Sequence, residues 1–448
     1  MKTVALRSLG CKVNAYETEG MQQILQQNGY SIVPFDTKAD IYIVNTCSVT
    51  NIADQKSRQM LHRAKKLNPE AVVVAAGCYV QTGREVLECD SAVDIIVGNN
   101  EKRNIAEVLE EYFAVNDIDT GRTADNTLSF VRDLSDKAEY EEMQVGVPAE
   151  HTRGFIKIQD GCNRFCTYCV IPYARGRIRS RKIEDVITEA ESFAKAGIKE
   201  IVLTGIHISS FGLDRGESEM IELLTKLSEI EGIENIRLGS LEPGLITPEF
   251  AEALKNLTKV CPHFHLSLQS GSETVLKRMN RHYTPDEYYE KVRLLRQVYD
   301  NPAITTDIIV GFPGETEEEF AETYEFARKV GFFEIHVFKY SRRDGTVAAK
   351  MPDQVAEQEK SLRSEKLIAL GEKMTEAYCL EHIGKDALLL IEEIKTIDGK
   401  DYLVGHTREY IVGAIPVDES DDTVKENTLI SGRFSEPIKM GIVLFEKA

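Results

Sequence analysis

The stretch FIKIQDGCNRFCTYC, residues 155–169, joins a short apolar run to three closely spaced cysteines. Residues 155–159 have the length and the apolar content of a β-strand. Cys162, Cys166 and Cys169 follow this run directly. In α/β folds, functional side chains gather in the loops that leave the carboxyl ends of parallel strands. This stretch therefore predicts a strand that carries three thiols into a functional site.

Further apolar runs follow this stretch, and helical patterns fill the gaps between them. The predicted strands are 155–159, 200–205, 235–240, 263–268, 305–310 and 334–340, and the predicted helices are 183–196, 219–230, 248–257, 285–298 and 317–330. Strands that alternate with helices in this way form parallel sheets. Because these units are too few for a closed eight-fold barrel, we predict an open or partial (β/α)6 barrel.

The two flanking regions have different patterns. Short apolar runs at 3–9, 41–45, 72–76 and 95–97 alternate with helical patterns, which predicts a parallel-sheet α/β domain. The end of the chain carries short strand-like runs with turn signals, which predict a small antiparallel β-barrel. We therefore expect a multidomain α/β protein with an amino-terminal domain at 1–114, a linker at 115–148 with one strand at 127–131, a core at 149–375 and a barrel at 376–448.

Charge and hydropathy exclude some classes of protein. The 448 residues carry 54 basic and 73 acidic side chains, a net charge of −19, so the chain is not a globally basic nucleic-acid binder, although a local basic patch is compatible with this balance. The longest apolar stretch, AVVVAAGCYV from Ala71, is half as long as the roughly 20 residues that a membrane-spanning helix needs. No signal-peptide pattern opens the sequence. We expect a soluble, cytoplasmic protein with no membrane partner.

The cysteine spacing favours metal binding over disulfides. Nine cysteines, an odd number, in a chain expected in the cytoplasm argue against a disulfide framework. Cys162, Cys166 and Cys169 can ligate three irons of a [4Fe–4S] cluster and leave the fourth iron open. A zinc site would need a fourth protein ligand, and none lies nearby in the sequence. Structural or incidental cysteines are the remaining alternative.

A second group of cysteines is spread over the amino-terminal domain. Cys11, Cys47 and Cys78 each follow a predicted strand. Parallel strands end at one edge of a sheet, so the three thiols are expected to converge there. Any one of them alone would more often be a small buried residue, but three at strand ends suit a second iron–sulfur cluster with an open iron. Cys89, Cys261 and Cys379 show no such placement, and we assign them no role.

The CxxxCxxC motif at this point of a (β/α)6 pattern resembles the radical S-adenosylmethionine superfamily. This resemblance implies that S-adenosylmethionine binds the open iron and is cleaved to a 5′-deoxyadenosyl radical, which abstracts hydrogen from the substrate. The residues at the matching strand ends are the expected cofactor-binding residues: Thr204, Gly205, Ser240, Glu242, Ser267, Gln269, Gly311, Phe312 and Pro313.

Clusters of arginine provide the local basic patches. Such runs are often only solvated surface, but beside two clusters they are candidates to bind an RNA backbone or the carboxylate of the methionine moiety. The RNA-binding candidates are Arg175, Arg177, Arg179, Arg181, Arg342 and Arg343.

With both cysteine groups in place, the whole chain resembles the methylthiotransferases. The motifs are SLGCKVN, NTCSVT, AGCYVQ, GCNRFCTYCVIPYARGRIRSR, SLQSGS and IVGFPGET. The residues around Cys11 and Cys47 are most similar to the branch that modifies threonylcarbamoyladenosine beside the tRNA anticodon, at carbon 2 of adenine. The resemblance implies two [4Fe–4S] clusters, two S-adenosylmethionine molecules, a tRNA substrate, an electron donor, a sulfur source and a TRAM-like carboxyl-terminal barrel.

Three alternatives remain open from the sequence. Sister branches methylthiolate isopentenyladenosine in tRNA or an aspartate of a small-subunit ribosomal protein, and a protein of another class would be a non-catalytic iron–sulfur carrier. The residues from Leu380 onward include 8 basic and 14 acidic side chains, a net charge of −6, whereas an RNA-binding barrel should be basic. The face that carries His406, Arg408 and Arg433 is the candidate RNA contact there.

Overall fold

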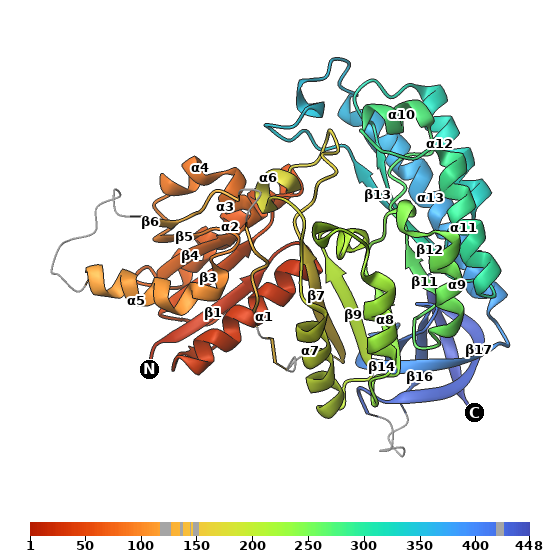
Figure 1. The fold of residues 1–448 in the computed structure, drawn as a ribbon, viewed down its shortest axis with the longest axis horizontal. Helices are drawn as coiled ribbons and strands as arrows, with labels where there is room; N and C mark the ends of the chain where they lie inside the picture. Colours follow the sequence, from red (N-terminus) through yellow and green to blue (C-terminus); the bar gives the residue numbers. More distant parts are fainter. Residues whose placement is uncertain (117–126, 135–137, 144, 147–151, 418–424) are drawn as a thin grey trace.

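The computed structural model describes residues 1–116, 127–134, 138–143, 145–146, 152–417 and 425–448. Figure 1 shows an amino-terminal sheet domain beside a central α/β core, with a small barrel packed below the core. No helix within these ranges is long and apolar enough to cross a membrane.

The amino-terminal domain is built on one parallel sheet in the order β2-β1-β3-β4-β5-β6. Its central strands are continuous buried runs rich in valine, isoleucine and alanine, as expected of a sheet that is covered on both faces. The strands are β1 (Thr3–Ser8), β2 (Ser31–Ile32), β3 (Ile41–Thr46), β4 (Val72–Gly77), β5 (Ile95–Val97) and β6 (Leu128–Phe130). The parallel sheet and the predicted strand in the linker are confirmed, and only the two-residue β2 was missed.

Helices cover both faces of this sheet. One face packs on α1 and α5, and the other packs on α2, α3 and α4. The elements are α1 (Lys12–Gln27), α2 (Asn51–Leu67), α3 (Cys78–Thr82), α4 (Arg84–Glu88), the short 3-10 helix η1 (Lys102–Asn104) and α5 (Ile105–Asn116). Part of the predicted linker lies outside the described residues. The described part packs on this domain, since Met143 is buried in its core and its carbonyl accepts a hydrogen bond from Tyr16.

The central core contains six parallel strands in sequence order, together with a short antiparallel strand at one edge. The strands are β7 (Arg153–Asp160), β8 (Arg179–Ser180), β9 (Glu200–Gly205), β10 (Asn235–Leu238), β11 (His263–His265), β12 (Ala303–Val310) and β13 (Glu334–Lys339). They form two sheets, β10-β9-β7-β8 and β11-β12-β13, and the isolated parallel bridges Ile236–Val260 and Leu241–Leu266 connect the sheets. All six parallel strands were predicted, and the antiparallel β8 was not.

Helices cover the outer side of these strands, and their apolar faces form the largest hydrophobic core of the chain. The five predicted helices are α7 (Ile183–Lys195), α8 (Met220–Ser228), α9 (Pro248–Asn256), α11 (Pro285–Val298) and α12 (Glu317–Val330). Two short helices and four 3-10 turns were not predicted: α6 (Ile171–Arg175), α10 (Glu273–Arg278), η2 (Ile208–Ser210), η3 (Leu213–Arg215), η4 (Pro243–Leu245) and η5 (Ala348–Lys350).

A long helix leads into the carboxyl-terminal domain. Helix α13 (Glu357–Glu381) was not predicted, and the predicted domain boundary at 375–376 falls inside it. Five strands then close into a barrel in the order β14-β15-β16-β18-β17. They are β14 (Asp386–Ile397), β15 (Lys400–Thr407), β16 (Val412–Pro416), β17 (Leu429–Lys439) and β18 (Ile442–Lys447). All neighbouring strands are antiparallel except β16 and β18.

This barrel closes the amino-terminal end of the core strands. Arg237 of β10 donates hydrogen bonds to the carbonyl oxygens of Thr407 at 3.1 Å and Arg408 at 3.0 Å. The ring of Tyr410 stacks on His263, at the start of β11, with 4.5 Å between the ring centroids. The small barrel therefore packs against the core through contacts with β10 and β11.

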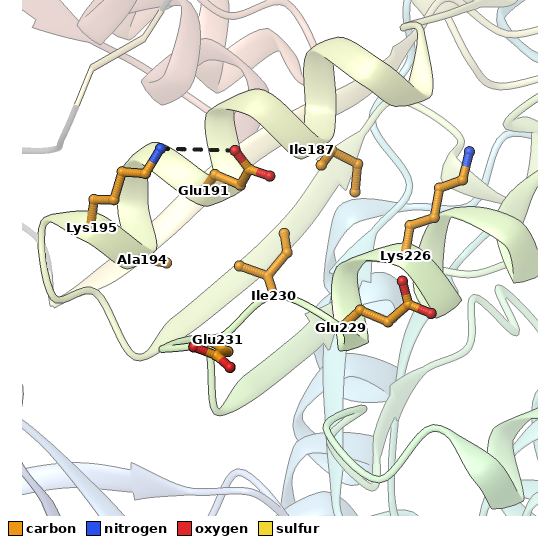
Figure 2. Close-up of a pocket in the computed structure, with 8 residues that line it drawn as sticks. All are labelled: Ile187, Glu191, Ala194, Lys195, Lys226, Glu229, Ile230 and Glu231. Carbon is orange, nitrogen blue, oxygen red and sulfur yellow. Dashed lines mark ion pairs between the residues drawn. The ribbon is translucent and has the colours of Figure 1, made fainter.

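A groove of about 490 Å³ runs between α7 and α8 on the outer surface of the core. In Figure 2, Lys195 and Glu191 form an ion pair at its rim, at 3.9 Å. No cysteine and no predicted strand-end residue lines it. The groove therefore takes no part in the site described next.

Candidate active site

The loop after β7 carries Cys162, Cys166 and Cys169, which we call the core trio. Gly161 begins the loop with φ +70°, and a Cβ atom on it would overlap the carbonyl oxygen of Arg177. The loop then folds back on itself, because Cys162 N donates to Gly176 O at 3.0 Å and Cys169 N donates to Cys166 O at 2.9 Å. The three thiols lie within electrostatic range of one another.

The turn after α10 anchors the other side of this loop. Thr167 donates to the carbonyl oxygens of Met279 at 3.0 Å, through its backbone N–H, and of Arg278 at 2.8 Å, through its hydroxyl. The amide of Asn280 donates to Phe165 O at 3.1 Å. Hydrogen bonds from both backbone and side chains thus fix the loop to this turn.

A buried carboxylate, Glu242, organises the polar groups beside the core trio. Its oxygens lie 2.6 Å from Arg164 Nε, 2.7 Å from His207 Nε2 and 3.3 Å from Arg281 Nη2. Burial alone would raise its pKa, but the hydrogen bond from His207 and the charge of Arg281 outweigh burial and hold the pKa at about 2. Arg281 also donates to Cys166 Sγ at 3.3 Å. Glu242 therefore fixes a guanidinium against one sulfur of the trio.

The chemistry of these donors suits an iron–sulfur cluster. Burial raises the pKa of Cys162 to about 11 and that of Cys169 to about 12, so both thiols are protonated in the metal-free protein. Iron binding requires thiolates and would release these protons. Three sulfurs with a nearby N–H donor match the ligand set and the hydrogen bonding of such clusters.

Cys11, Cys47 and Cys78 form the amino-terminal trio. The three cysteines follow the ends of β1, β3 and β4, which are paired in register. Ser8 lies opposite Asn45, and Thr46 lies opposite Gly77, so the thiols lie at one edge of the sheet. Burial raises the pKa of Cys47 to about 11, and the charges of Cys78 and Cys11 add to this rise. The structure therefore places the three thiols at one edge of the sheet, where their charges influence one another.

Glycine is required where the Cys11 loop passes over Cys47. Gly10 has φ +94°, and a Cβ atom there would lie 2.6 Å from Cys47 Sγ. The side-chain amide of Asn14 then ties the loop down by donating to Leu9 O at 2.7 Å and Thr46 O at 2.9 Å. The first turn of α1 thus holds two of the three cysteine loops.

Arg175, the last residue of α6, connects the two trios. Its Nε donates to Cys78 Sγ at 3.2 Å, and its Nη1 lies 2.8 Å from Glu17 and 3.1 Å from Asp160. Glu17 lies on α1 after Cys11, and Asp160 precedes the core-trio loop. Arg175 is fully buried. One guanidinium therefore joins the loops of both trios.

Four of the six arginines predicted to bind RNA are buried in contacts within the protein. Arg175 and Arg179 bind Asp160, Arg181 pairs with Glu142 and Glu189, and Arg343 lies 2.7 Å from Asp54. Their partners come from other parts of the chain, so the basic sequence did not reveal them. The prediction that these four arginines contact RNA is therefore wrong, because their side chains are buried and paired. Arg177 and Arg342 are exposed.

The predicted strand-end residues all end or follow parallel strands of the core. Thr204, Gly205, Ser240, Ser267 and Gln269 end β9 or follow β10 and β11, at the edge where Glu242 lies. Gly311, Phe312 and Pro313 follow β12 and, like Thr204, are buried. Phe312 packs against Tyr168 of the core-trio loop and against Tyr340, so its side chain supports the loop from below.

Sequence reasoning missed Arg281, His207, Asn14 and Glu17. Each is a single polar residue in a loop or on an amphipathic helix, where it resembles a solvent-facing residue. The only signal was the position of Asn14 and Glu17 directly after the SLGC motif.

Comparisons with known proteins agree with this geometry. Residues 156–327 match the model of the radical SAM superfamily, and residues 3–98 match that of the uncharacterized protein family UPF0004. The chain is 42% identical over 413 residues to the threonylcarbamoyladenosine tRNA methylthiotransferase MtaB of Bacillus subtilis, covering 92% of this chain and 90% of the relative. The chain belongs to the radical S-adenosylmethionine methylthiotransferases.

Other methylthiotransferases are similar over the same length. MtaB of Aquifex aeolicus is 39% identical, covering 89% of this chain and 95% of the relative. A tRNA-2-methylthio-N(6)-dimethylallyladenosine synthase of a Thermoanaerobacter species is 38% identical, covering 93% and 87%. Among solved structures, the radical S-adenosylmethionine methyltransferase TsrM of Kitasatospora setae, with cobalamin and a [4Fe–4S] cluster bound, superposes with a TM-score of 0.57 at 17% identity, over 78% of this chain and 77% of that one. At this identity the likeness shows the fold alone.

Membership in the superfamily implies one [4Fe–4S] cluster and S-adenosylmethionine as cofactors. This methylthiotransferase joins its two matched domains through Arg175, since Glu17 lies in the first matched region and Asp160 in the second.

Proposed function

We propose that the chain inserts a methylthio group at carbon 2 of threonylcarbamoyladenosine next to the tRNA anticodon. The observation that carries the proposal is the contact of Arg175 with Cys78, Glu17 and Asp160, which holds two cysteine trios against each other. A sulfur-inserting enzyme needs its radical source and its sulfur source at one site. The two MtaB relatives, at 42% and 39% identity, support the choice of substrate.

The core trio is proposed to hold the [4Fe–4S] cluster that binds S-adenosylmethionine, and the amino-terminal trio a second cluster. When bound, these groups would supply the one-electron chemistry that activates an unreactive carbon, and the inserted sulfur would come from the second cluster or from a sulfide attached to it. Arg281 and Arg175 each direct an N–H at one sulfur of a trio. Such hydrogen bonds tune a cluster's reduction potential.

The remaining cofactor-binding proposals concern the strand ends beside Glu242. This carboxylate is anionic at neutral pH, so it keeps Arg164, Arg281 and His207 fixed around the core trio. Ser240 and Gln269 are proposed to contact S-adenosylmethionine from the neighbouring loops. The backbone of Gly311 is a further candidate, while Phe312 supports the loop.

The tRNA is proposed to dock across the exposed arginines that flank the trios. Arg177 follows α6 and stacks over Phe165 of the core-trio loop at 4.5 Å. The carbonyl of Arg342 accepts a hydrogen bond from Asn51, near Cys47. The carboxyl-terminal barrel is proposed to be TRAM-like. Because two of its polar residues, His406 and Arg408, contact the protein itself, its acidic surface contributes fewer phosphate contacts than the core.

The proposed reaction requires two further partners. Reductive cleavage of S-adenosylmethionine consumes an electron, so an electron donor must bind the enzyme. Each methylthio group removes one sulfur atom, so a sulfur source must replace it. Both are expected in the cytoplasm, where tRNA is modified.

A nucleoside profile tests this function. Transfer RNA from a strain that lacks the gene should lose the 2-methylthio derivative of threonylcarbamoyladenosine and keep that of isopentenyladenosine. Loss of the isopentenyl derivative instead would assign the chain to the sister branch. With dithionite, the reconstituted protein should convert S-adenosylmethionine to 5′-deoxyadenosine, and a non-catalytic iron–sulfur carrier would not.

A further inference from the structure

A polar cavity of about 220 Å³ lies where the three parts of the chain meet. Lys12 lines it from the amino-terminal domain, and Tyr410 lines it from the small barrel. The core strands contribute the rest of the wall: Arg237, Leu238, Gly239, Ser240, His263, His265, Thr305, Asp307, Glu334 and His336. This volume is several times the roughly 30 Å³ that one water molecule occupies in the liquid, so the cavity has room for a polar substituent of several heavy atoms.

The ammonium of Lys12 is the cation of this wall that lacks a counter-ion. Within the described residues it makes no hydrogen bond or ion pair, and its one aromatic contact is the ring of Phe155 at 5.9 Å. Its charged neighbours include two cations, Arg153 and Arg237, and the nearby Glu200 is already bound by Arg237 at 2.8 Å. Lys12 is exposed and, among the described residues, unpaired at the wall of this cavity, so its ammonium is available to an anionic ligand.

The other cation of the wall, Arg237, is paired, and the two carboxylates of the wall, Asp307 and Glu334, lie beside histidines. Arg237 binds Glu200, Asp307 lies 3.2 Å from His265, and Glu334 lies 3.7 Å from His336. Lys12 is therefore the cation that remains for a ligand.

The rest of the wall offers uncharged hydrogen-bonding groups. Thr305 Oγ1 lies 3.0 Å from His265 Nδ1 and 3.3 Å from His263 Nε2. His263 Nδ1 is buried and makes no hydrogen bond in the described part of the chain. Ser240 adds an exposed hydroxyl. These groups suit a ligand that carries hydroxyl and N–H groups beside its anion.

We propose that this cavity is the specificity pocket for the amino-acid substituent of the modified adenine, and that Lys12 binds its carboxylate. The inference rests on the proposed function and deepens it. A threonylcarbamoyl group has a carboxylate, a hydroxyl and N–H groups, whereas an isopentenyl group has none of these. A site built for hydrogen bonds rejects an analogue that lacks them, because its own polar groups lose solvent without gaining partners.

The test uses the full chain with reconstituted clusters, under anaerobic conditions and without S-adenosylmethionine. Binding is measured to anticodon stem-loop RNAs that carry threonylcarbamoyladenosine, its neutral methyl ester, isopentenyladenosine or unmodified adenosine. The wild type should bind the acid about tenfold or more tighter than the ester, since hydrogen bonds to charged groups contribute about 1.5–3 kcal/mol. Lys12→Met should remove this difference, and Lys12→Arg should keep most of it.

The matched control is Lys195→Met, which changes an exposed lysine in the outer groove of Figure 2. It should leave all four affinities unchanged. Iron and sulfide content of Lys12→Met should equal that of the wild type, which separates loss of a carboxylate contact from damage to the neighbouring Cys11.

Three outcomes would overturn the inference. If the wild type binds the threonylcarbamoyladenosine RNA and its methyl ester with equal affinity, the pocket does not recognise the carboxylate, whatever the result with Lys12→Met. If Lys12→Met still prefers the acid, another residue binds it. If Lys12→Met weakens only the binding of S-adenosylmethionine, measured separately, the carboxylate is that of the methionine moiety. Tighter binding of the isopentenyl RNA by the wild type would instead refute the proposed function.

Discussion

Arg175 illustrates how much of this site depends on single buried contacts. Its side chain reaches a cysteine sulfur of one domain and the carboxylate that precedes the cysteine loop of the other. The basic motif around it predicted a surface for RNA, yet the alternate residues Arg179 and Arg181 also turn inward. The sequence shows that this segment is basic. It does not show that the fold places Glu17 and Asp160 against Arg175.

Gly161→Ala should abolish iron binding by the core trio. The residue requires φ +70°, and a methyl group would overlap the Arg177 carbonyl that the loop packs against. The measurement is iron content and the electron paramagnetic resonance spectrum of the reduced protein.

Gly29→Ala is the matched control, because Gly29 also has positive φ but faces open space. It should cost about 1–2 kcal/mol of stability, from the backbone conformation alone, and keep full iron content. Full iron content in Gly161→Ala would show that the loop tolerates a side chain there.

Elements with a regular apolar face could be predicted from the sequence, and those without one could not. Helix α12 was predicted, and it begins with a capping box between Thr316 and Glu319 and ends before Gly331. Helix α13 was not predicted because its buried face is not uniformly apolar. Lys360 and Arg363 are among its buried side chains. The carboxyl-terminal strands were predictable because turn residues separate them.

The same reasoning explains which parts of the site were predictable. Each of the six trio cysteines follows a strand of recognisable pattern, so its position at the sheet edge is a local property. Arg281 and His207 reach the site through Glu242, and such a contact depends on three separate loops. The spacing of these three residues in the sequence does not indicate that they are in contact.

Arg343→Met should loosen the start of α2. Arg343 follows β13 and binds Asn51, Asp54 and Ser48, so it fixes the loop that carries Cys47 to the core. Hydrogen exchange of the amides of residues 48–58 should become at least about tenfold faster, since losing a buried charged partner costs 3–5 kcal/mol.

The neighbouring Arg342→Met provides the comparison. Arg342 is exposed and contributes only its backbone carbonyl to Asn51, so exchange in residues 48–58 should match that of the wild type. Equal exchange in both variants would mean that Arg343 does not hold this loop.

The molecule as a whole depends on an ionic contact between its two larger domains, and this contact makes its stability pH-dependent. Despite burial, the charges of Arg175, Lys102 and Lys157 hold the pKa of Glu17 well below its usual range, and Lys157 and Arg175 do the same for Asp160. Because the folded pKa lies below the unfolded one, the stabilisation is present above about pH 4.5 and is lost as pH falls further.

Urea unfolding of the metal-free protein measures this effect. The contribution of this ionic contact to the free energy of unfolding should be lost as pH falls below about 4.5. Glu17→Gln should be less stable than the wild type at pH 7 by about 3–5 kcal/mol, and the gap should narrow as pH falls. A gap that stays constant down to low pH would contradict the assignment.

RNA binding by this acidic chain should depend on a few exposed cations. Replacing Arg177 and Arg342 together with alanine should reduce the slope of log affinity against log salt concentration by roughly 0.7–0.9 per residue. Arg328→Ala, on the outer face of α12, should leave the slope unchanged. An unchanged slope in the double variant would place the RNA elsewhere.

We propose that the two cysteine trios hold two separate clusters at one site. The most direct test compares the wild type with a variant in which Cys11, Cys47 and Cys78 are all alanine, after anaerobic reconstitution. The wild type should contain two four-iron clusters per chain, and the variant one. The variant should still form 5′-deoxyadenosine but no methylthiolated RNA. Equal iron content, or a methylthiolated product from the variant, would contradict the account.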